Sequence, residues 1–164
     1  MIRRHYFFNS SINTPFQSIK NLTSSALATG KWLKHQGLEP DECIILNSLP
    51  LHHISGFMPW WRHQTWQSEY HWISHSIMHK PLKLRQFSEA LTKKYRRPLI
   101  TSLVPTQLLS LIDEPDGLEW LQSLALIWVG EKRLIALGGI FDLDSIIRIL
   151  DVSIVSGSTE IFRS

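Results

Sequence analysis

The stretch Cys43-Ile44-Ile45-Leu46-Asn47-Ser48-Leu49-Pro50-Leu51-His52-His53-Ile54-Ser55-Gly56 decides how this chain folds. Its first part is an apolar run of strand length, which is typical of a strand buried on both faces of a parallel sheet. Pro50 then ends the strand, because proline cannot donate a hydrogen bond to a sheet ladder. Two histidines and a Ser-Gly pair follow at the carboxyl end of the strand, which is the edge of an open α/β sheet where ligands bind.

Strand-like and helical segments alternate along the rest of the chain. The patterns predict strands over residues 43–49, 69–74, 99–104, 124–129 and 152–155, and helices over residues 18–37, 54–66, 84–95 and 105–112. Residues 113–117 are predicted to form a loop, a further helical region is expected after residue 129, and residues 1–17 show no clear period. Because the strands are apolar on both faces, the predicted fold is α/β with three layers: a mostly parallel sheet flanked by helices.

The composition indicates one globular domain. The chain has 164 residues, of which 43% are hydrophobic and 19% charged, so it can bury a sizeable core. The formal net charge is +3, and the basic residues are scattered. The densest basic group, at residues 93–97, is interpreted as the polar end of a helix. A nucleic-acid partner would need a continuous basic face, so none is expected.

The sequence favours a cytoplasmic protein. Cys43 is the single cysteine, so no internal disulfide can form, and its apolar surroundings predict a buried, inert thiol. No apolar run approaches the roughly 18–20 residues that a membrane helix needs, so no membrane insertion is expected. Residues 1–9 are basic but lack the apolar region and cleavage site of a secretory signal.

The segment 50–56, Pro-Leu-His-His-Ile-Ser-Gly, resembles the Pro-Leu-x-His-x-x-Gly segment of adenylate-forming enzymes, the acyl-CoA synthetase-like ligases. Together with Met58-Pro59-Trp60-Trp61-Arg62, it is similar more narrowly to the o-succinylbenzoate–CoA ligases of menaquinone and phylloquinone biosynthesis. The resemblance covers most of residues 18–164 and implies part of the large N-terminal domain of such an enzyme. The implied reaction joins a small aromatic carboxylic acid to ATP with Mg²⁺, releases pyrophosphate, and transfers the acyl group to CoA.

The resemblance places His53 beside the acyl pocket and the reacting carboxylate, as a catalytic residue. An imidazole suits this place because it can donate a hydrogen bond to developing negative charge. His52, Ser55 and Gly56 are expected to line the same substrate site. The alternative for His53 is a ring that hydrogen-bonds to the backbone at the end of a strand.

Arg62 and Trp61 are further candidates for binding the substrate. The planar guanidinium of Arg62 can hold a carboxylate bidentately, and o-succinylbenzoate has a second carboxylate that is not activated. The alternative is an ordinary surface arginine. Two adjacent tryptophans cannot share one face of a helix, so we expect one of Trp60 and Trp61 to pack on the core and the other to line the pocket.

A second matching segment is Val104-Pro105-Thr106, since similar ligases carry Val-Pro-Thr at a junction between a strand and a helix. Pro105 suits the first position of a helix. Thr106 would then lie at the amino end of that helix, where free backbone N–H groups favour anions. We therefore expect Thr106 to bind substrate, and simple helix capping is the alternative.

Two later segments resemble the nucleotide-binding part of the ligases. Gly130 takes the place of the first glycine in a Gly-Gly-Ala-like turn near the adenine, although Glu131-Lys132-Arg133 replaces the small residues. The segment 156–160, Ser-Gly-Ser-Thr-Glu, resembles the family's Tyr-Gly-x-Thr-Glu motif, with Ser156 in place of the aromatic residue. The resemblance implies that Thr159 is catalytic and contacts phosphate, that Gly157 and Ser158 bind nucleotide, and that Glu160 holds Mg²⁺.

The family's phosphate-binding loop, which is rich in Ser, Thr and Gly and ends in Pro-Lys, has no match before residue 18. The segment 24–31 has a similar composition, but it lies in a helical pattern. No segment matches the family's small C-terminal domain with its adenylation lysine. We therefore expect a partial adenylate-forming domain over residues 18–164, after a poorly defined lead-in at 1–17.

The main alternative is a non-catalytic remnant or binding module that keeps only the pocket for the aromatic acid. In either case the chain can form homo-oligomers. A serine hydrolase built on Ser55 lacks the G-x-S-x-G elbow. His71, His75 and His79 are spaced four apart and would form a metal site on a helix, but residues 69–74 favour a strand, so no metal is expected there.

Overall fold

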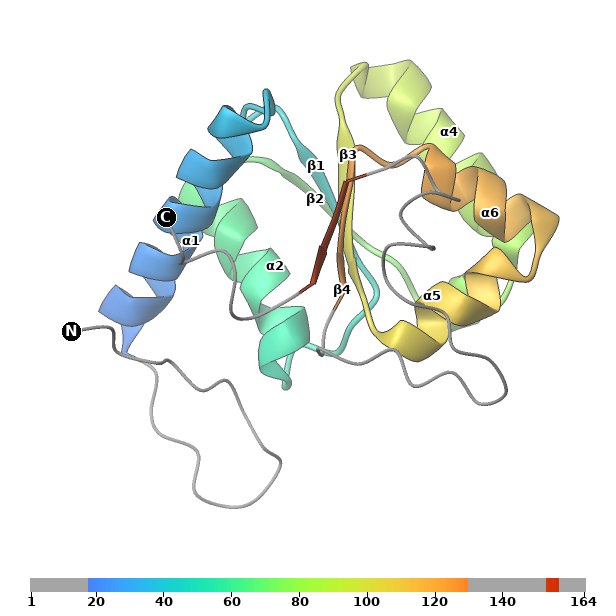
Figure 1. The fold of residues 1–164 in the computed structure, drawn as a ribbon, viewed down its shortest axis with the longest axis horizontal. Helices are drawn as coiled ribbons and strands as arrows, with labels where there is room; N and C mark the ends of the chain where they lie inside the picture. Colours follow the sequence, from blue (N-terminus) through green and yellow to red (C-terminus); the bar gives the residue numbers. More distant parts are fainter. Residues whose placement is uncertain (1–17, 130–152, 157–164) are drawn as a thin grey trace.

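One parallel sheet organises the computed structural model, which describes residues 18–129 and the strand 153–156 (Figure 1). The described strands are β1 (Ile44–Asn47), β2 (Glu69–Trp72), β3 (Leu99–Leu103), β4 (Leu126–Val129) and β5 (Ser153–Ser156). They lie in the order β2-β1-β3-β4-β5, and every pairing is parallel. The predicted parallel sheet and all its predicted strands are confirmed. Residues 1–17 and the helical region expected after residue 129 lie outside the described residues.

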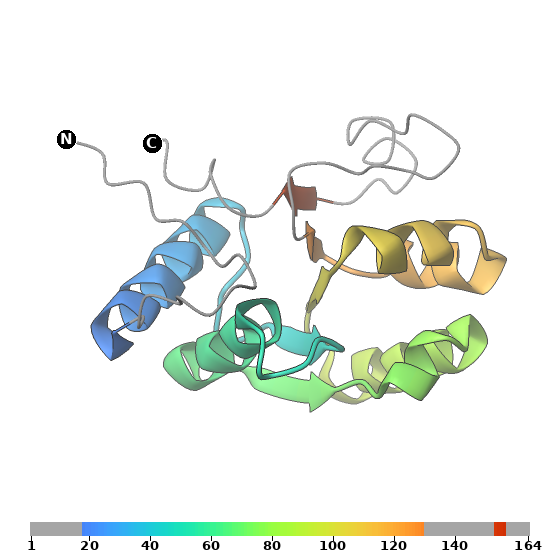
Figure 2. The ribbon, with the colours of Figure 1, turned by 90° about the horizontal axis from the view of Figure 1, so that it is seen from below.

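Helices cover both faces of the sheet. Helices α1 (Ile19–His35) and α2 (Ile54–Trp66) pack together on one face, whereas α4 (Pro81–Tyr95), α5 (Pro105–Ile112) and α6 (Pro115–Gln122) lie on the other (Figures 1 and 2). A single helical turn, α3 (His75–Met78), joins β2 to α4. The predicted three-layered α/β fold is confirmed.

Each face of the sheet has its own hydrophobic core because side chains alternate along every strand. Ile45, Ile100 and Trp128 point toward α1 and α2, where they pack with Leu33 and Trp66. Their strand neighbours belong to the larger core under α4, α5 and α6; among them are Ile44, Leu46, Leu103, Ile127 and Val129. Burial on both faces explains why the strands show no alternation of apolar and polar residues.

Helices α1 and α2 lie in close contact. The indole Nε1 of Trp66 donates a buried hydrogen bond to the carbonyl of Ala26 at 2.9 Å. A Cβ added at Gly30 would lie only 2.9 Å from the same Nε1, so a glycine is needed where the two helices meet. The segment that mimics a phosphate-binding loop in composition is therefore the middle of helix α1, as the helical pattern predicts.

The predicted loop at residues 113–117 is wrong, because helix α6 begins at Pro115. Proline is favoured in the first turn of a helix, where its missing N–H has no partner to lose. Gly117 lies inside α6 because a Cβ there would come within 2.3 Å of the carbonyl oxygen of Leu111. Pro115 and Gly117 are residues that favour turns, but here they begin a helix that packs closely on α5.

The connections between strands reverse direction in the middle of the sheet. From β1 the chain passes through α2 to β2 at one side, returns through α4 to β3, and continues through α5 and α6 to β4 (Figure 1). The loops that leave β1 and β3 therefore diverge toward opposite faces, although these strands are neighbours. This is a topological switch point, and the carboxyl edge of an open α/β sheet binds ligands at such points.

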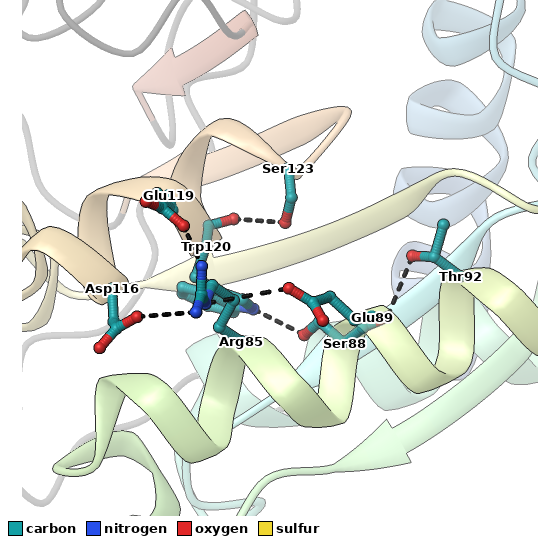
Figure 3. A network of polar contacts seen from close by, with 8 residues as sticks. All are labelled: Arg85, Ser88, Glu89, Thr92, Asp116, Glu119, Trp120 and Ser123. Atoms are coloured by element: carbon teal, nitrogen blue, oxygen red, sulfur yellow. Dashed lines mark hydrogen bonds and ion pairs between the residues drawn. The ribbon is translucent and has the colours of Figure 1, made fainter.

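Helices α4 and α6 are joined by an ionic cluster around Arg85 (Figure 3). The guanidinium of Arg85 lies 3.1 Å from a carboxylate oxygen of Asp116 and 3.8 Å from one of Glu89, and it also pairs with Glu119. The three carboxylates belong to partly or well exposed residues, so each pair contributes little to stability on its own.

A buried hydrogen bond lies beneath this ionic cluster (Figure 3). The indole of Trp120 is fully buried, and its Nε1 donates to Oγ of Ser88 at 2.6 Å. The hydroxyl of Ser123 in turn donates to the Trp120 carbonyl at 2.6 Å. The buried serine in α4 therefore satisfies the one polar atom of a large core side chain in α6.

We expect Ser88→Ala to destabilise the chain by about 1–3 kcal/mol, because it leaves the buried Trp120 N–H without an acceptor. Ser110→Ala is the matched control, since Ser110 is an exposed serine of a neighbouring helix and its replacement should change stability by no more than about 0.5 kcal/mol. Urea unfolding followed by tryptophan fluorescence measures both. Equal stability of the two variants would contradict a structural role for the Ser88–Trp120 bond.

Candidate functional site

Asn47, the last residue of β1, organises the loop at the switch point. Its side chain is fully buried, and Nδ2 donates to the carbonyl of Gly56 at 2.8 Å and to the Tyr70 hydroxyl at 3.0 Å. Its Oδ1 accepts a hydrogen bond from the backbone N–H of Leu49 at 3.0 Å. One amide therefore fastens the start of the loop, the first turn of α2 and strand β2 to one another.

Gly56 is required by the close approach of α2 to the loop before it. A Cβ at this position would lie 2.2 Å from the carbonyl oxygen of Pro50 and 2.4 Å from that of Leu49. Both are backbone atoms, so no side chain can move aside to make room. The structure thus gives a physical reason for a glycine six residues after the proline.

His52 and His53 lie side by side at the amino end of α2, and both are exposed. Their ring centroids are 4.1 Å apart. The backbone of His53 is held firmly, since its N–H donates to Pro50 and its carbonyl accepts from Gly56 and Phe57. The ring of His53 makes no hydrogen bond within residues 18–129, so the alternative of a ring bonded to backbone is not seen.

Gln107 ties the loop after β3 to the loop after β1. Its side-chain oxygen accepts from the backbone N–H of Val104 at 3.2 Å, and its Nε2 lies 3.4 Å from Oγ of the buried Ser48. Pro105 opens α5 as predicted, and Thr106 follows it as an exposed residue in the first helical turn. Thr106 and His53 thus follow two adjacent strands at the same edge of the sheet.

Three side chains form a row across this edge on the face covered by α2. Asn47 is in register with Ser102, and Ser102 is in register with Trp128. The residues two positions earlier on the three strands are Ile45, Ile100 and Leu126, which belong to the core that faces α1 and α2. Side chains two positions apart on a strand point to the same face, so the row also faces α1 and α2.

Arg62 projects from α2 toward this row. Its guanidinium carbon lies 4.5 Å from the centroid of the Trp128 ring, a cation–π contact. Helical side chains lean toward the amino end of their helix, and for α2 that direction is the carboxyl edge of the sheet. Arg62 is thus half-buried, with its guanidinium on an aromatic ring.

The donors of this pair lack acceptors. Nε of Arg62 and Nε1 of Trp128 are both buried and have no hydrogen-bond partner in the described part of the chain. Burial lowers the pKa of Arg62 to about 10, so the guanidinium is still a cation at neutral pH. Buried donors are nearly always satisfied in proteins, and a ligand carboxylate or phosphate would satisfy these.

The two tryptophans of α2 do not divide between core and pocket as expected. Both are half-buried, and both pack on Phe57, with ring centroids 5.4 Å away for Trp60 and 5.8 Å away for Trp61. Residues three and four positions after Phe57 lie on the same side of the helix, one turn further on, so a single ring contacts both. Trp61 has a buried Nε1 without a described partner.

The residues expected to bind nucleotide and magnesium lie outside the described residues; they are Gly130, Gly157, Ser158, Thr159 and Glu160. Strand β5, which ends at Ser156, directly precedes four of them. Because β5 is parallel to β4, β5 ends at the same carboxyl edge of the sheet as β1 and β3.

The three histidines spaced four apart do not share a helix. His71 belongs to β2, where its Nε2 lies 3.2 Å from a carboxylate oxygen of Glu69 and its ring contacts Phe87. His75 begins α3, and His79 follows the end of that helix. Among residues 18–129 and 153–156, no group of three His, Cys, Asp or Glu side chains could hold a metal ion.

Neither candidate nucleophile has an activating partner in the described residues. Burial raises the pKa of Cys43 to about 12, so this residue is a thiol at neutral pH, and its Sγ donates to the carbonyl of Glu39. Ser55 is exposed in the first turn of α2 and makes no described hydrogen bond with a histidine. The prediction of an inert cysteine agrees with this environment.

No helix within the described residues is long and apolar enough to cross a membrane.

The fold is shared with solved structures of an adenylate-forming enzyme. No family model and no curated protein matches the sequence. o-Succinylbenzoate CoA synthetase from Bacillus subtilis, in complex with ATP and a magnesium ion, superposes with a TM-score of 0.54 and 20% identity over 84% of this chain. A double mutant of the same synthetase, bound with its product analogue OSB-NCoA, gives a TM-score of 0.54 and 19% identity over 84%.

These two likenesses show that the described part of the chain has the α/β fold found in adenylate-forming CoA ligases, as predicted. Among the particular structures that it matches are those of o-succinylbenzoate CoA synthetase, the enzyme to which the sequence has its narrower resemblance. The chain spans about a quarter of the length of that synthetase, 25% in both comparisons. At this level of identity the likeness shows the fold, and function rests on the residues of the site.

We expect Asn47→Ala to destabilise the chain by roughly 2–4 kcal/mol, because it strands the N–H of Leu49 and removes two further hydrogen bonds of the buried network. The carbonyl of Gly56 loses its side-chain donor in this variant, and the Tyr70 hydroxyl loses the Asn47 amide. Tyr70→Phe is the matched control, because it removes one hydroxyl from the same network and should cost only about 0.5–1.5 kcal/mol. Urea unfolding of the two variants tests this order, and a larger loss in Tyr70→Phe would refute it.

Gly56→Ala should cost about 3 kcal/mol, because the new methyl group overlaps two backbone carbonyls. Ser55→Ala, one residue earlier on the exposed side of α2, should be close to neutral. Thermal unfolding and circular dichroism of the pair provide the measurement. If Gly56→Ala unfolded at the same temperature as Ser55→Ala, the result would refute the close contact between Gly56 and the carbonyls of Leu49 and Pro50.

Proposed function

We propose that this chain is part of an acid–CoA ligase of the adenylate-forming kind, and that it holds an aromatic carboxylic acid at the switch point between β1 and β3. The observation that carries this proposal is that two buried donors at that edge, Nε of Arg62 and Nε1 of Trp128, have no hydrogen-bond partner among residues 18–129 and 153–156. Two buried donors, one of them cationic, suit a carboxylate better than any neutral group. An o-succinylbenzoate-like diacid fits because one carboxylate can pair with Arg62 while the other reacts.

His53 is the residue proposed to act on the reacting carboxylate. Its backbone is fixed by the hydrogen bonds that open α2, whereas its exposed ring is available to a ligand. An imidazole N–H at this place would donate to the carboxylate oxygen that gains negative charge. His52, Ser55, Gly56 and Trp61 are proposed to line the acid site from the same loop and helix, and Thr106 from the start of α5.

The proposal assigns nucleotide binding to residues that follow β4 and β5. Gly130, Gly157 and Ser158 would lie against ATP, Thr159 would contact phosphate, and Glu160 would hold Mg²⁺. ATP, when bound, supplies the leaving group that activates the acid, and CoA supplies the thiol that takes the acyl group. Residues 18–164 would form part of the domain that carries this chemistry, in the cytoplasm, whether as a monomer or a homo-oligomer.

A second candidate is a binding module that holds the acid without ATP chemistry. Glu131-Lys132-Arg133 favours it, because charged side chains stand where similar ligases carry small residues. Small residues let a backbone approach a ligand closely, and bulky ones prevent this approach. The acid site built from Arg62, Trp128 and His53 is common to both candidates.

Arg62→Lys should weaken binding of o-succinylbenzoate at least tenfold, because an ammonium group cannot match the bidentate geometry of a guanidinium. Benzoate, which lacks the second carboxylate, should bind the native chain and the variant equally weakly. Arg97→Lys is the matched control, since Arg97 is exposed. Isothermal titration calorimetry gives each affinity. An unchanged affinity of Arg62→Lys for o-succinylbenzoate would remove the basis for the acid site.

Titration with ATP and Mg²⁺ separates the two candidate functions. A ligase should bind both the acid and ATP and release pyrophosphate, and Glu160→Gln should abolish the release while leaving acid binding intact. A binding module should take the acid alone. Binding of neither ligand by the folded chain would refute both candidates.

A further inference from the structure

Acidic residues are absent from the first 38 positions of the chain. Residues 1–38 hold five of the 17 Lys and Arg but none of the 14 Asp and Glu, and the first acidic residue is Glu39. The rest of the chain, residues 39–164, therefore has 12 basic and 14 acidic residues. A charge asymmetry of this kind indicates a partner with an anionic surface, either a membrane or a nucleic acid.

Helix α1 carries the described part of this segment and presents a basic stripe to solvent at the margin of the fold (Figure 1). Its buried side, with Ala26 and Leu33, contacts Trp66 of α2. The other side bears exposed residues at spacings of four and three, which place them along one side of a helix; they are Lys20, Ser24, Leu27, Lys31 and Lys34. Lys34 pairs with Glu39 at 3.0 Å, whereas no ion pair of the described residues includes Lys20 or Lys31.

Two exposed aliphatic side chains lie beside these lysines. Ile19 is 71% exposed and Leu27 is 58% exposed, so they are the most exposed large hydrophobic residues in the part of the chain that the structure describes. Aliphatic groups beside lysines suit a lipid interface, where the apolar groups enter the headgroup region and the ammonium groups meet phosphates. A single-stranded nucleic acid would instead need exposed aromatic rings on which its bases stack. The one aromatic residue of α1, Trp32, is partly buried and packs against the core, so the helix favours lipid.

The geometry points to reversible binding of an anionic lipid surface by the exposed side of α1. The lysines of the stripe contact the lipid headgroups, and the two aliphatic side chains lie among them. The helix rests along the surface, because its other side packs on α2. Each lysine near an anionic leaflet contributes about fivefold to the affinity, so several act together. Arg3 and Arg4 add two positive charges before α1 in the sequence. No residue of the proposed acid site belongs to α1, so the two proposals are independent.

Cosedimentation of the full-length, untagged chain with lipid vesicles tests this surface. At about 0.1 M NaCl the chain should bind phosphatidylcholine vesicles that contain about 30% phosphatidylserine, and it should bind pure phosphatidylcholine at least tenfold more weakly. Raising NaCl to about 0.5 M should weaken the binding, because salt screens exposed charges. Equal affinity for the two kinds of vesicle, or binding to neither, would overturn the proposal.

Charge reversal on α1 separates a specific surface from adsorption by net charge. Lys20→Glu/Lys31→Glu should weaken binding to the phosphatidylserine vesicles at least tenfold. Lys83→Glu/Lys93→Glu is the matched control, since it makes the same change of net charge at two exposed lysines of α4 and should weaken binding less than about threefold. Equal losses in the two double variants would contradict a role for α1, because binding would then follow net charge alone.

The aliphatic contribution is tested by Leu27→Ser, which should weaken vesicle binding about threefold or more, because its side chain enters the headgroup region. Leu82→Ser, at an exposed leucine of α4, should leave the binding unchanged. Circular dichroism of each variant confirms that it is folded. If the native chain bound a single-stranded oligonucleotide but no vesicle, and Lys20→Glu/Lys31→Glu lost that binding, a nucleic acid would replace lipid as the partner.

Discussion

The buried amide of Asn47 is the constraint on which the candidate site depends. A polar side chain at the end of a fully buried strand must find partners for its donors and acceptor, because an unsatisfied amide is costly in the interior. Asn47 finds them in the loop, the helix and the strand that follow it along the chain. The same three bonds fix where α2 begins, and therefore where His53 and Arg62 stand relative to the sheet.

Because the strand order reverses between β1 and β3, the loop held by Asn47 lies next to the loop that follows β3. Loops from β1 and β3 diverge from one edge, and Gln107 holds them together by reaching Ser48. Between α2 and the sheet lies the buried row of Asn47, Ser102 and Trp128, and the guanidinium of Arg62 lies on the ring of Trp128 at its end. The amide of Asn47 has its hydrogen bonds satisfied and shapes this region, whereas Nε of Arg62 has no hydrogen-bond partner among the described residues.

Much of this architecture could be predicted from the sequence. Apolar runs without alternation predict a parallel sheet, and the helices α1 and α4 are predicted because their apolar positions repeat at helical spacing. Helix α6 was missed because Asp113, Pro115 and Gly117 all favour turns, and only the close approach to Leu111 explains a glycine within a helix.

The site was only partly predictable for a similar reason. His53 and Gly56 stand in a recognisable pattern, whereas Asn47 and Gln107 matter through contacts with residues distant in sequence. The sequence does show that a polar residue, Asn47, directly follows the apolar run 43–46. Its hydrogen-bond partners Tyr70 and Gly56 cannot be inferred from the spacing of residues. The equal packing of Trp60 and Trp61 on Phe57 likewise depends on which face of α2 meets the sheet.

The pairing of β1 with β3 joins segments more than fifty residues apart, as the bond from Thr101 to the carbonyl of Leu46 shows. Contacts at such separation form late, because a long stretch of chain must be ordered before they can be made. The loop after β1 can close on its own asparagine early, but its link to Gln107 must wait for β3. Competence to bind at the switch point should therefore appear only with the final docking of the sheet, which makes a ligand there a reporter of complete folding.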